Sequence, residues 1–449
     1  MDGIRTAYRR IPEGAAPRIA KRTSNLFRFR SDGDVGLDVS GFDQVLSVDP
    51  ERRTADVGGM VTYERLVDAT LPYGLMPLVV PQLRTITLGG AVTGLGIEST
   101  SYRTGLPHES VLEMEILTGA GEVVVATPDN EHADLFMAFP NSYGTLGYAL
   151  RLTIELEPVK PYVTLRHLRF DDAASAMATL GEIWERSAYQ GEGFDFVDGV
   201  AFSRDEVYLT LGSFADEAPY TSDYTGMDIY FRSIQQRDTD HLTIYDYLWR
   251  WDTDWFWCSG AFGLQRPGIR RLWPRRYRRS DVYRRLVAWD RRHQVSARID
   301  RWRGRPATEA VIQDIEVPVG RVADFLDFFH REIKISPVWL CPLRLRPPAG
   351  DRPVRSWPLY PLEPDVRYVN LGFWSGVPLP KGREDGYYNR LIEDEVTRLD
   401  GHKSLYSDAY YTPEEFWRLY NGVAYREVKR AYDPRGRLLN LYDKCVRNR

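Results

Sequence analysis

The run of residues 81–100 constrains this chain most, because it places Gly89, Gly90, Gly94 and Gly96 among small and β-branched residues. Glycine lets a backbone approach a ligand closely and adopt positive φ angles without steric penalty. The run contains neither the P-loop motif nor the glycine fingerprint of a dinucleotide-binding βαβ unit. It therefore predicts main chain laid against a large, flat ligand of another kind.

A second glycine-bearing loop supports this interpretation. Residues 141–147 read Asn141-Ser-Tyr-Gly-Thr-Leu-Gly147 and come directly before a predicted strand. The two loops lie about fifty residues apart, and each adjoins a strand. Such a pair is suited to enclosing one extended cofactor between them.

Length and composition set broad limits. With 449 residues and 43% hydrophobic content, the chain has room for two or three domains with full-sized cores. The net charge of −4 at pH 7 predicts no nucleic-acid partner. The sequence has no run of 18 apolar residues and no signal-peptide pattern at its start. Its three cysteines are widely spaced, which predicts neither disulfides nor a metal site and indicates a cytoplasmic protein.

Short β-rich segments and glycine turns alternate over the first third of the chain, which indicates an α+β domain. The expected strands are 35–39, 45–48, 54–57, 111–118, 123–126 and 148–156, and the expected helices are 62–71 and 132–139. Two prolines within 157–161 mark a domain boundary.

A second α+β domain is expected beyond that boundary. Its predicted strands are 163–170, 193–197, 206–214, 311–317 and 368–374, and its predicted helices are 172–187, 321–333 and 388–399. A final helix is expected to start at Thr412, with Glu415 completing a capping box.

The segment between about 240 and 305 differs in composition from the rest. Seven of the twelve tryptophans lie there, and residues 266–285 contain nine arginines against one acid, Asp281. Tryptophan favours the membrane interface, and clustered arginine attracts anionic head groups. The alternative is a solvated charged face with no partner.

Several motifs together resemble the FAD-binding domain of the vanillyl-alcohol-oxidase (PCMH-type) flavoproteins. They are Thr87-Leu-Gly-Gly-Ala-Val92, Gly94-Leu-Gly96, Gly119-Ala-Gly-Glu122 and Gly144-Thr-Leu-Gly147. In that family these loops hold the pyrophosphate and the isoalloxazine ring. The resemblance implies a two-domain α+β fold, with a PCMH-type FAD-binding domain and an α+β substrate cap.

Within that family the chain resembles the Δ24-sterol reductases, over roughly residues 20 to 445. The resemblance is carried by Thr93-Gly-Leu-Gly-Ile-Glu-Ser99, Arg103-Thr-Gly-Leu106, Asp134-Leu-Phe136, Gln313-Asp314, Pro337-Val-Trp-Leu-Cys-Pro342, Tyr406-Ser-Asp408 and Glu414-Glu-Phe-Trp417. It implies an FAD-binding domain over 1–162 that starts late, a cap over 163–405 including the Trp/Arg-rich 245–305, and a C-terminal segment, 406–449, that returns to the flavin.

The resemblance also implies non-covalent FAD, because no histidine or cysteine stands where the family forms covalent flavin links. Thr23, Ser24 and Asn25 are expected near the pyrophosphate. The other expected FAD-binding residues are Pro81, Thr87, Leu88, Gly89, Gly90, Thr93, Gly94, Gly96, Ile97, Glu98, Ser142, Gly144, Thr145, Gly147 and Tyr148.

In the sterol reductases an isolated C=C bond is reduced, with NADPH as electron source. The expected order is protonation by an enzyme acid, giving a tertiary carbocation, followed by hydride from flavin N5. Actinobacterial reductases that resemble this family convert a 10-methylene fatty-acyl chain of a phospholipid into a 10-methyl branch, as in tuberculostearic acid. Of the 59 basic residues, 52 are arginine and seven are lysine. This arginine bias, the absence of the sterol reductases' membrane segment and the Trp/Arg segment favour this substrate over a sterol.

That substrate implies a peripheral position on the inner face of the membrane, with contact through residues 249–285. A lipid methyltransferase is then a pathway partner. No second nucleotide fingerprint marks a site for NADPH.

Three residues are candidates for the proton donor: Glu98, Asp314 and Tyr410. Glu98 closes the glycine run, and its alternative role is to anchor a backbone amide. Asp314 is either a carboxylic acid in an apolar pocket or a solvent-facing strand residue. Tyr410, with Tyr411 and Lys444, lies in the C-terminal segment expected at the flavin.

Two other residues are expected to be structural. His108 follows a Gly-Leu-Pro turn and is interpreted as a solvated turn histidine. Cys341 lies in an apolar run and is expected to pack as a small hydrophobe. Two functions compete with C=C reduction: a sugar-lactone or alcohol oxidase, and a flavin-binding or membrane-associated scaffold without catalysis.

Overall fold

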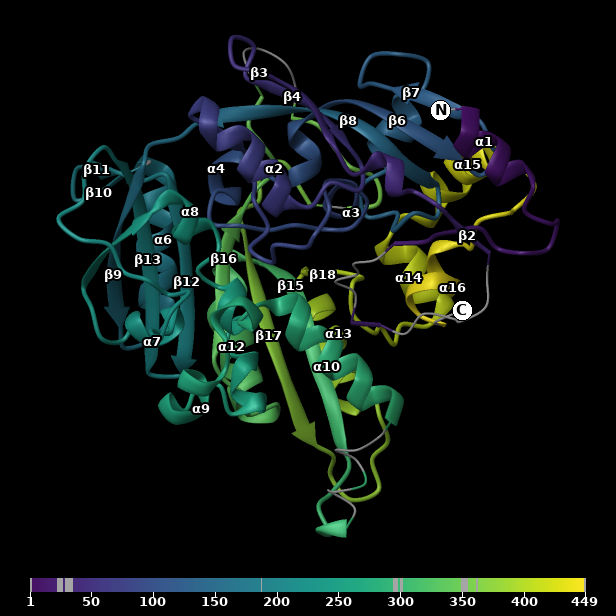
Figure 1. Ribbon diagram of the computed structural model, residues 1–449. Helices are drawn as coiled ribbons and strands as arrows, with labels where there is room; N and C mark the ends of the chain where they lie inside the picture. The colour runs from purple at the N-terminus through teal and green to yellow at the C-terminus, as the bar shows by residue number, and fades with distance from the viewer. Residues whose placement is uncertain are drawn as a thin grey trace.

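The computed structural model describes residues 2–21, 27–28, 35–186, 188–293, 298, 302–348, 354–360 and 362–447. Two large antiparallel sheets dominate it, one of six strands and one of eight, each with helices packed against it (Figure 1). The predicted α+β class is confirmed.

The six-stranded sheet is built from the first third of the chain. Its order is β3-β4-β8-β6-β7, and β5 also pairs with β8. The strands are β3 (Val45–Asp49), β4 (Thr54–Gly58), β5 (Leu75–Pro77), β6 (Val111–Thr118), β7 (Val123–Ala126) and β8 (Gly147–Pro158). The helices in this part are α1 (Asp2–Arg9), α2 (Tyr63–Thr70), α3 (Leu88–Thr93), α4 (Ser101–Thr104) and α5 (Ala133–Ala138), and β1 (Arg18–Ile19) pairs in parallel with β2 (Gly36–Leu37).

The eight-stranded sheet has the order β14-β9-β13-β12-β16-β17-β15-β18. Its strands are β9 (Tyr162–Phe170), β12 (Phe196–Ser203), β13 (Glu206–Ala215), β14 (Thr239–Thr243), β15 (Thr308–Pro318), β16 (Val338–Leu343), β17 (Tyr368–Pro378) and β18 (His402–Lys403), and β10 (Ala188–Tyr189) and β11 (Glu192–Gly193) form a separate hairpin. Three helices share a core with it: α6 (Ala173–Arg186), α12 (Val322–Glu332) and α13 (Tyr387–Arg398).

Alternation along β15 determines which side chains reach the functional region. Val311, Ile315 and Val317 belong to the core shared with α6, α12 and α13. Successive side chains of a strand point to opposite faces. Asp314, at an even position of the same strand, therefore faces away from those helices.

The Trp/Arg-rich segment is only partly a surface. Trp249, Trp251 and Trp255 are buried in the core, so they are not available to a membrane. Their burial corrects the prediction that the whole of 249–285 contacts lipid. The segment forms α8 (Ile244–Leu248), α9 (Pro267–Leu272) and α10 (Ser280–His293), with α7 (Tyr230–Ser233) just before it. Its exposed large apolar side chains lie in α9, in α10, in the segment between them and at Trp302.

The C-terminal helices are α14 (Pro413–Leu419), α15 (Gly422–Tyr432) and α16 (Leu441–Cys445). The predicted capping box is present, since Thr412 accepts from the amide of Glu415 and the Glu415 carboxylate accepts from the amide of Thr412. Helix α15 packs against α5 of the six-stranded part, so the end of the chain lies beside its beginning (Figure 1).

Candidate functional site

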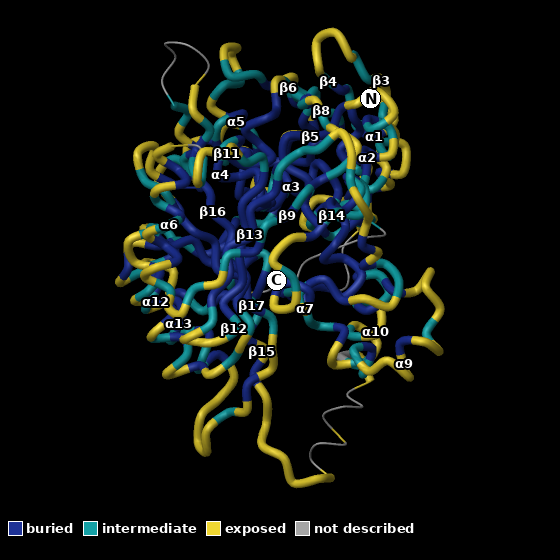
Figure 2. The backbone as a smooth tube through the Cα atoms, turned by 90° about the vertical axis from the view of Figure 1, so that its left-hand side faces the viewer, coloured by how far each residue is buried: buried dark blue, intermediate teal, exposed yellow. Residues whose placement is uncertain are grey.

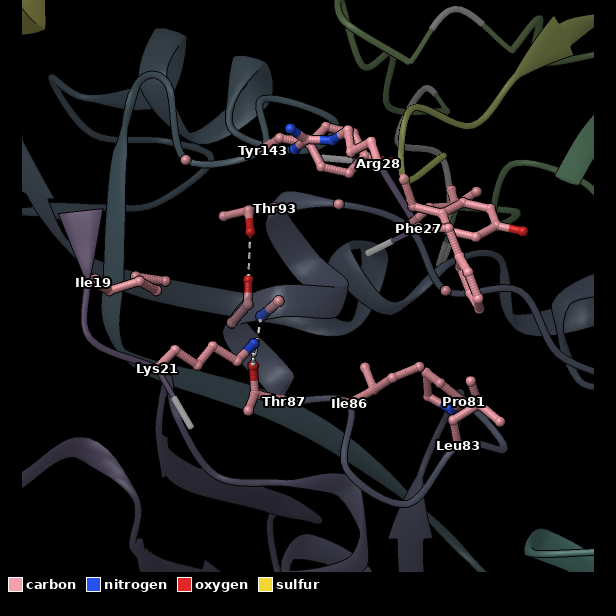
Figure 3. A pocket seen from close by; sticks show the side chains of 18 of the residues that line it. Ile19, Lys21, Phe27, Arg28, Pro81, Leu83, Ile86, Thr87, Thr93 and Tyr143 are labelled. Carbon is pink, nitrogen blue, oxygen red and sulfur yellow. Dashed lines mark hydrogen bonds between the residues drawn. The ribbon is translucent and has the colours of Figure 1, made fainter. Parts of the chain in front are cut away.

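A cavity of about 490 Å³ lies where these parts meet. Its volume is within the range of small-molecule and cofactor sites. The lining comes from residues 16–21 and 27–28, the glycine run 81–98, the loop 143–149, the cap, and the C-terminal residues Leu438, Leu439 and Lys444. Figure 3 shows Lys21, Thr87, Thr93, Arg28 and Tyr143 around it.

The first glycine loop contains a short helix rather than extended chain throughout. Thr87 caps α3 by accepting the amide of Gly90 at 3.2 Å, and Lys21 donates to the same hydroxyl at 2.8 Å (Figure 3). Gly89 is required for packing, since a Cβ there would lie 2.6 Å from the carbonyl oxygen of Gly59. A Cβ on Gly90 would meet the side chains of Thr87 and Lys21. The helix start and Lys21 thus form a polar, cationic end of the cavity.

The second loop is held in a demanding conformation. Asn141, Tyr143 and Gly144 have φ angles of 61°, 50° and 74°, which are uncommon for residues other than glycine. Asn141 is buried and donates to the carbonyl of Leu359 at 2.6 Å. The guanidinium of Arg28 lies 5.4 Å from the centre of the Tyr143 ring. Strain of this kind persists where the surroundings fix the loop, which is typical of ligand clamps.

Most of the predicted cofactor residues line this cavity. They are Pro81, Thr87, Gly89, Gly90, Thr93, Gly94, Gly96, Ile97, Glu98, Gly144, Gly147 and Tyr148. Leu88, Ser142 and Thr145 are buried and support the loops without being part of the lining. Thr23, Ser24 and Asn25 lie outside the described residues.

An aromatic wall forms the cap side of the cavity. It consists of Trp255, Phe256, Trp339 and Trp374, with Phe27 stacked on Trp255 at 5.6 Å. Phe256 stacks on Trp374 at 4.4 Å. Trp255 and Phe256 have φ angles of 45° and 57°, an unusual pair for bulky side chains. The wall makes this side of the cavity apolar and aromatic.

Asp314 lines the cavity beside this wall. Asn370 donates to its Oδ1 at 3.1 Å, and Tyr406 also bonds to it. Burial raises the pKa of the Asp314 carboxyl to about 6, while the hydrogen bonds from Asn370 and Tyr406 oppose that rise. Its partner in β17 is Gly372, where a Cβ would lie 2.5 Å from Asp314 Oδ1 and 2.6 Å from the Trp374 ring. The glycine leaves room for a carboxyl and an indole side by side.

Glu98 is in a different environment. It is buried, and both carboxyl oxygens are bonded to Gln82, with Oε1 accepting the Gln82 amide at 2.9 Å. Burial raises its pKa to about 8, opposed by Arg250 and by the Gln82 bonds. Gln82 Oε1 has no hydrogen-bond partner among the described residues. Glu98 therefore ties the end of the glycine run to its start through Gln82.

The other predicted residues are scattered. Tyr410 lies outside the lining, with its hydroxyl 3.4 Å from Asp385 Oδ2. Tyr411 is buried in the core, whereas Lys444 lines the cavity. Cys341 is fully buried and packs as expected.

The prediction of a solvated His108 is wrong. The side chain is buried against Trp357, at a ring distance of 4.5 Å, and Tyr360. Burial lowers the pKa of its imidazole to about 3. The Gly-Leu-Pro turn that precedes it is directed inward, which the local sequence does not reveal.

Several residues that line the cavity were not predicted individually. They are Lys21, Arg28, Trp255, Phe256, Trp339, Trp374 and Tyr406. Trp339 lies in the Pro337–Pro342 motif and Tyr406 in the Tyr406-Ser-Asp408 motif, so both carried a signal. Trp255 and Phe256 lie in the segment whose tryptophans were predicted to contact a membrane, so their place in the cavity was not predicted.

The residues present fit an extended cofactor with a flat ring. One end of the lining has Lys21, Thr87 and glycine main chain, and the other has aromatic side chains. Buried polar atoms without a partner among the described residues lie along it, including Tyr143 Oη and Gln82 Oε1. Such atoms are usually satisfied by a ligand or by water.

Comparison with known proteins agrees with this geometry. Residues 14–127 match the family described as FAD binding domain. A Delta(24)-sterol reductase of Arabidopsis thaliana is 27% identical over 92% of this chain and 77% of the plant protein. The Delta(24)-sterol reductase of Homo sapiens is 26% identical over 90% of this chain and 76% of its own length. A Decaprenylphosphoryl-beta-D-ribose oxidase of Mycolicibacterium smegmatis is 32% identical over 35% of each chain.

The protein is an FAD-dependent oxidoreductase with a PCMH-type FAD-binding domain. The matched residues 14–127 contribute the glycine run and the Lys21–Thr87 end of the cavity. No helix among the residues that the structure describes combines the length and apolar character needed to cross a bilayer.

Proposed function

We propose that this enzyme reduces a lipid C=C bond, with the 10-methylene fatty-acyl chain of a phospholipid as its substrate and NADPH as the source of electrons. The observation that carries the proposal is the placement of one carboxyl, Asp314, beside an aromatic wall in the same cavity as the FAD-binding loops. An isolated alkene needs an acid, a hydride donor and a dry pocket, and this arrangement provides for all three.

The chemistry follows from the side chains that line the cavity. Asp314 donates a proton from its carboxyl to the terminal CH₂ of the methylene group, and the C=C electron pair forms the new C–H bond. The adjacent carbon becomes a tertiary cation, which the faces of Trp374 and Phe256 stabilise. When bound, reduced FAD supplies the hydride that completes the methyl branch. A solvent proton then restores the acid form of Asp314, and NADPH restores the two electrons.

Tyr406 and Asn370 position this acid. Trp374 donates its indole N–H to the Tyr406 hydroxyl at 3.1 Å, and Tyr406 bonds in turn to Asp314. Asn370 donates to Oδ1 of the same carboxyl. These two contacts restrict the orientation of the Asp314 carboxyl beside the cavity that it lines.

A Δ24-sterol-type reduction is the second candidate. It is supported by relatives named Delta(24)-sterol reductase that are about one quarter identical over nine-tenths of this chain. The same acid and hydride chemistry applies to a trisubstituted alkene. The arginine-rich exterior described below favours an anionic phospholipid over a neutral sterol.

The test is a reductive half-reaction followed by re-oxidation, both without oxygen. The purified flavoprotein is reduced with NADPH and mixed with a 10-methylene phospholipid, with a Δ24-sterol, or with neither. We expect rapid re-oxidation with the methylene lipid and formation of the 10-methyl product by mass spectrometry. Preferential turnover of the sterol would select the second candidate. If neither lipid re-oxidises the flavin and later admission of oxygen does, the protein is an oxidase.

A strain that lacks the gene gives an independent test. We expect methylene-branched acyl chains to accumulate and 10-methyl chains to disappear. Restoring the wild-type gene should reverse both changes, whereas Asp314→Asn should not. An unchanged lipid profile in the deletion strain would contradict the methylene substrate.

A further inference from the structure

Helices α9 and α10, with the segment 273–279 that joins them, carry an exposed apolar surface that does not line the cavity. Its apolar members are Ile269, Leu272, Tyr277, Leu286 and Trp289. Leu272 is 85% exposed and Trp289 is 56% exposed, and three further exposed apolar side chains lie in the same short segment. In Figure 2 both helices lie at the periphery of the molecule, away from the buried core. We call these residues, with the exposed arginines among them, the α9–α10 surface.

The α9–α10 surface is strongly cationic. Residues 266–293 contain eleven arginines against two aspartates. Arg266, Arg271, Arg275, Arg276, Arg285 and Arg292 are exposed. Arg275 and Arg285 pair with Asp223 and Asp281 in exposed positions, where ion pairs are weak. No ion pair to another residue within the described ranges involves Arg271 or Arg276.

Other arginines of the same segment have a different task, which is to hold the helices in place. Arg270 is buried and pairs with Asp254 at 2.7 Å. Arg278 donates to the backbone carbonyls of Arg270 and Trp273. Arg279 pairs with Glu64 of α2 at 2.7 Å. The exposed apolar and cationic groups therefore stand on a fixed platform.

The inner face of α10 packs on the wall of the cavity. Tyr283 and Val287 belong to one apolar cluster with Trp255, Leu83 and Phe27. The last three of these residues line the cavity. The α9–α10 surface thus covers the outside of a wall whose inside faces the site.

We propose that the α9–α10 surface docks on an anionic phospholipid bilayer, with Leu272 and Trp289 inserted among the head groups and the exposed arginines paired with lipid phosphates. Charge complementarity selects the occupant: the arginines need an anion, and the protruding aliphatic side chain needs an apolar phase. A nucleic acid satisfies the first need and leaves Leu272 in water. The proposal does not depend on the reduction proposed above, because docking requires no turnover.

Sedimentation with lipid vesicles tests the proposal on the intact flavoprotein. We expect binding to vesicles of phosphatidylglycerol and phosphatidylcholine that weakens with added salt, and little binding to phosphatidylcholine alone. Removing two arginines in Arg271→Ala/Arg276→Ala should weaken binding by about 25-fold at low salt, taking about five-fold for each. Leu272→Asp and Trp289→Asp should each weaken it by about ten-fold or more.

Matched substitutions elsewhere serve as controls. Leu46→Asp changes an equally exposed apolar residue on β3, and Arg52→Ala/Arg430→Ala removes two exposed arginines from β-turn and helix positions away from α9 and α10. Both should bind vesicles as the wild type does. All variants alter exposed side chains, so their flavin content and melting temperatures should match.

Two results would overturn the proposal. One is equal vesicle binding by the wild type and by Leu272→Asp, Trp289→Asp and the double arginine variant. The other is tight binding to a single-stranded RNA oligomer, unchanged by Leu272→Asp, together with no binding to anionic vesicles. The second result would make the surface a polyanion site.

Discussion

At the scale of single residues, Asp314 and Glu98 are two carboxyls in one cavity with different surroundings. Burial raises the pKa of Asp314 to about 6 and that of Glu98 to about 8. Asp314 is open to the cavity, whereas both oxygens of Glu98 are bonded to Gln82. Because the two pKa values differ, the pH dependence of the reaction can show which carboxyl donates the proton.

If Asp314 donates the proton, product formation requires its acid form. The single-turnover rate of the pre-reduced enzyme should be constant below pH 6 and fall about ten-fold per pH unit above it. Asp314→Asn should lower the rate by about 100-fold or more and leave the flavin spectrum unchanged. A fall that begins near pH 8, with the rate of Asp314→Asn preserved, would assign the proton to Glu98 instead.

Glu98 should make stability depend on pH. Because its pKa in the folded protein is about 8 and its ordinary value is 4.5, the folded state retains a proton that the unfolded state releases. The stability that Glu98 contributes to the folded state is fully present below pH 4.5 and is lost as the pH rises to about 8. Between pH 5 and pH 8 the free energy of unfolding of the wild type should fall by roughly 3 kcal/mol more than that of Glu98→Gln, as measured by urea unfolding. Equal pH dependence in both proteins would show that Glu98 is ionised when folded.

The place of a residue could be predicted from the sequence where the residue lay in a motif, and could not where burial decided it. Gly89 and Glu98 belong to the glycine run and line the cavity. His108 resembled a turn residue, although the fold buries it against Trp357. Burial depends on segments that are distant in the sequence, and the residues next to His108 do not indicate which segments pack against it.

At the scale of elements, the start of α3 is the most constrained part of the FAD-binding region. A Cβ on Gly89 would lie 2.6 Å from the carbonyl oxygen of Gly59, which directly follows β4. Gly181 in α6 is a natural contrast, because a Cβ at that position would have no neighbouring atom within 4 Å.

Gly89→Ala should therefore lower the free energy of unfolding by about 1–3 kcal/mol and reduce the flavin content of the purified protein. Gly181→Ala should raise the free energy of unfolding by up to about 1 kcal/mol, since alanine favours a helix interior. Urea titration and flavin absorbance measure both effects. Unchanged stability and flavin content in Gly89→Ala would show that β4 and α3 separate easily.

Most of the longer strands were predictable because their apolar periodicity is local. The prediction of 111–118 and 123–126 as strands is confirmed, and 62–71 contains α2. Strands β14, β16 and β18 were not predicted: β18 has two residues, and β16 contains a proline, Pro342. A strand of this kind is defined by its neighbours in the sheet more than by its own sequence.

At the scale of the whole molecule, the C-terminal segment is tied to the FAD-binding loop. Lys429 of α15 donates to the carbonyl of Thr145 at 2.6 Å and to that of Leu438 at 2.9 Å, and it pairs with Asp433 at 2.7 Å. Leu438 and the loop around Thr145 both contribute to the cavity region. One cation therefore joins two parts of its lining.

Lys429→Met should remove these bonds with little change in volume, so the loop at 141–147 should loosen. We expect the affinity for FAD to fall about ten-fold, as measured by flavin fluorescence during dilution. Arg430→Met, on the exposed side of the same helix, should bind FAD as the wild type does. Equal FAD affinity in the two variants would show that the loop does not depend on α15.

The overall architecture could be predicted only in part. The α+β class and the FAD-binding domain followed from strand spacing and from motifs. The order of the eight-stranded sheet did not, because β15 and β17 pair across about fifty intervening residues and local periodicity does not specify such partners. The burial of Trp249 and Trp251 was missed for the same reason.

The contact of Arg28 with the carbonyls of Leu405 and Lys444 has a consequence in time. Residues about 400 positions apart must meet before the cavity has all its walls, and such distant contacts form late in folding. A growing chain therefore has the glycine loops long before it has a place that retains a flavin. Acquisition of the cofactor becomes a last step of maturation. The ratio of flavin absorbance to protein in a preparation therefore reports the fraction of chains that have finished folding.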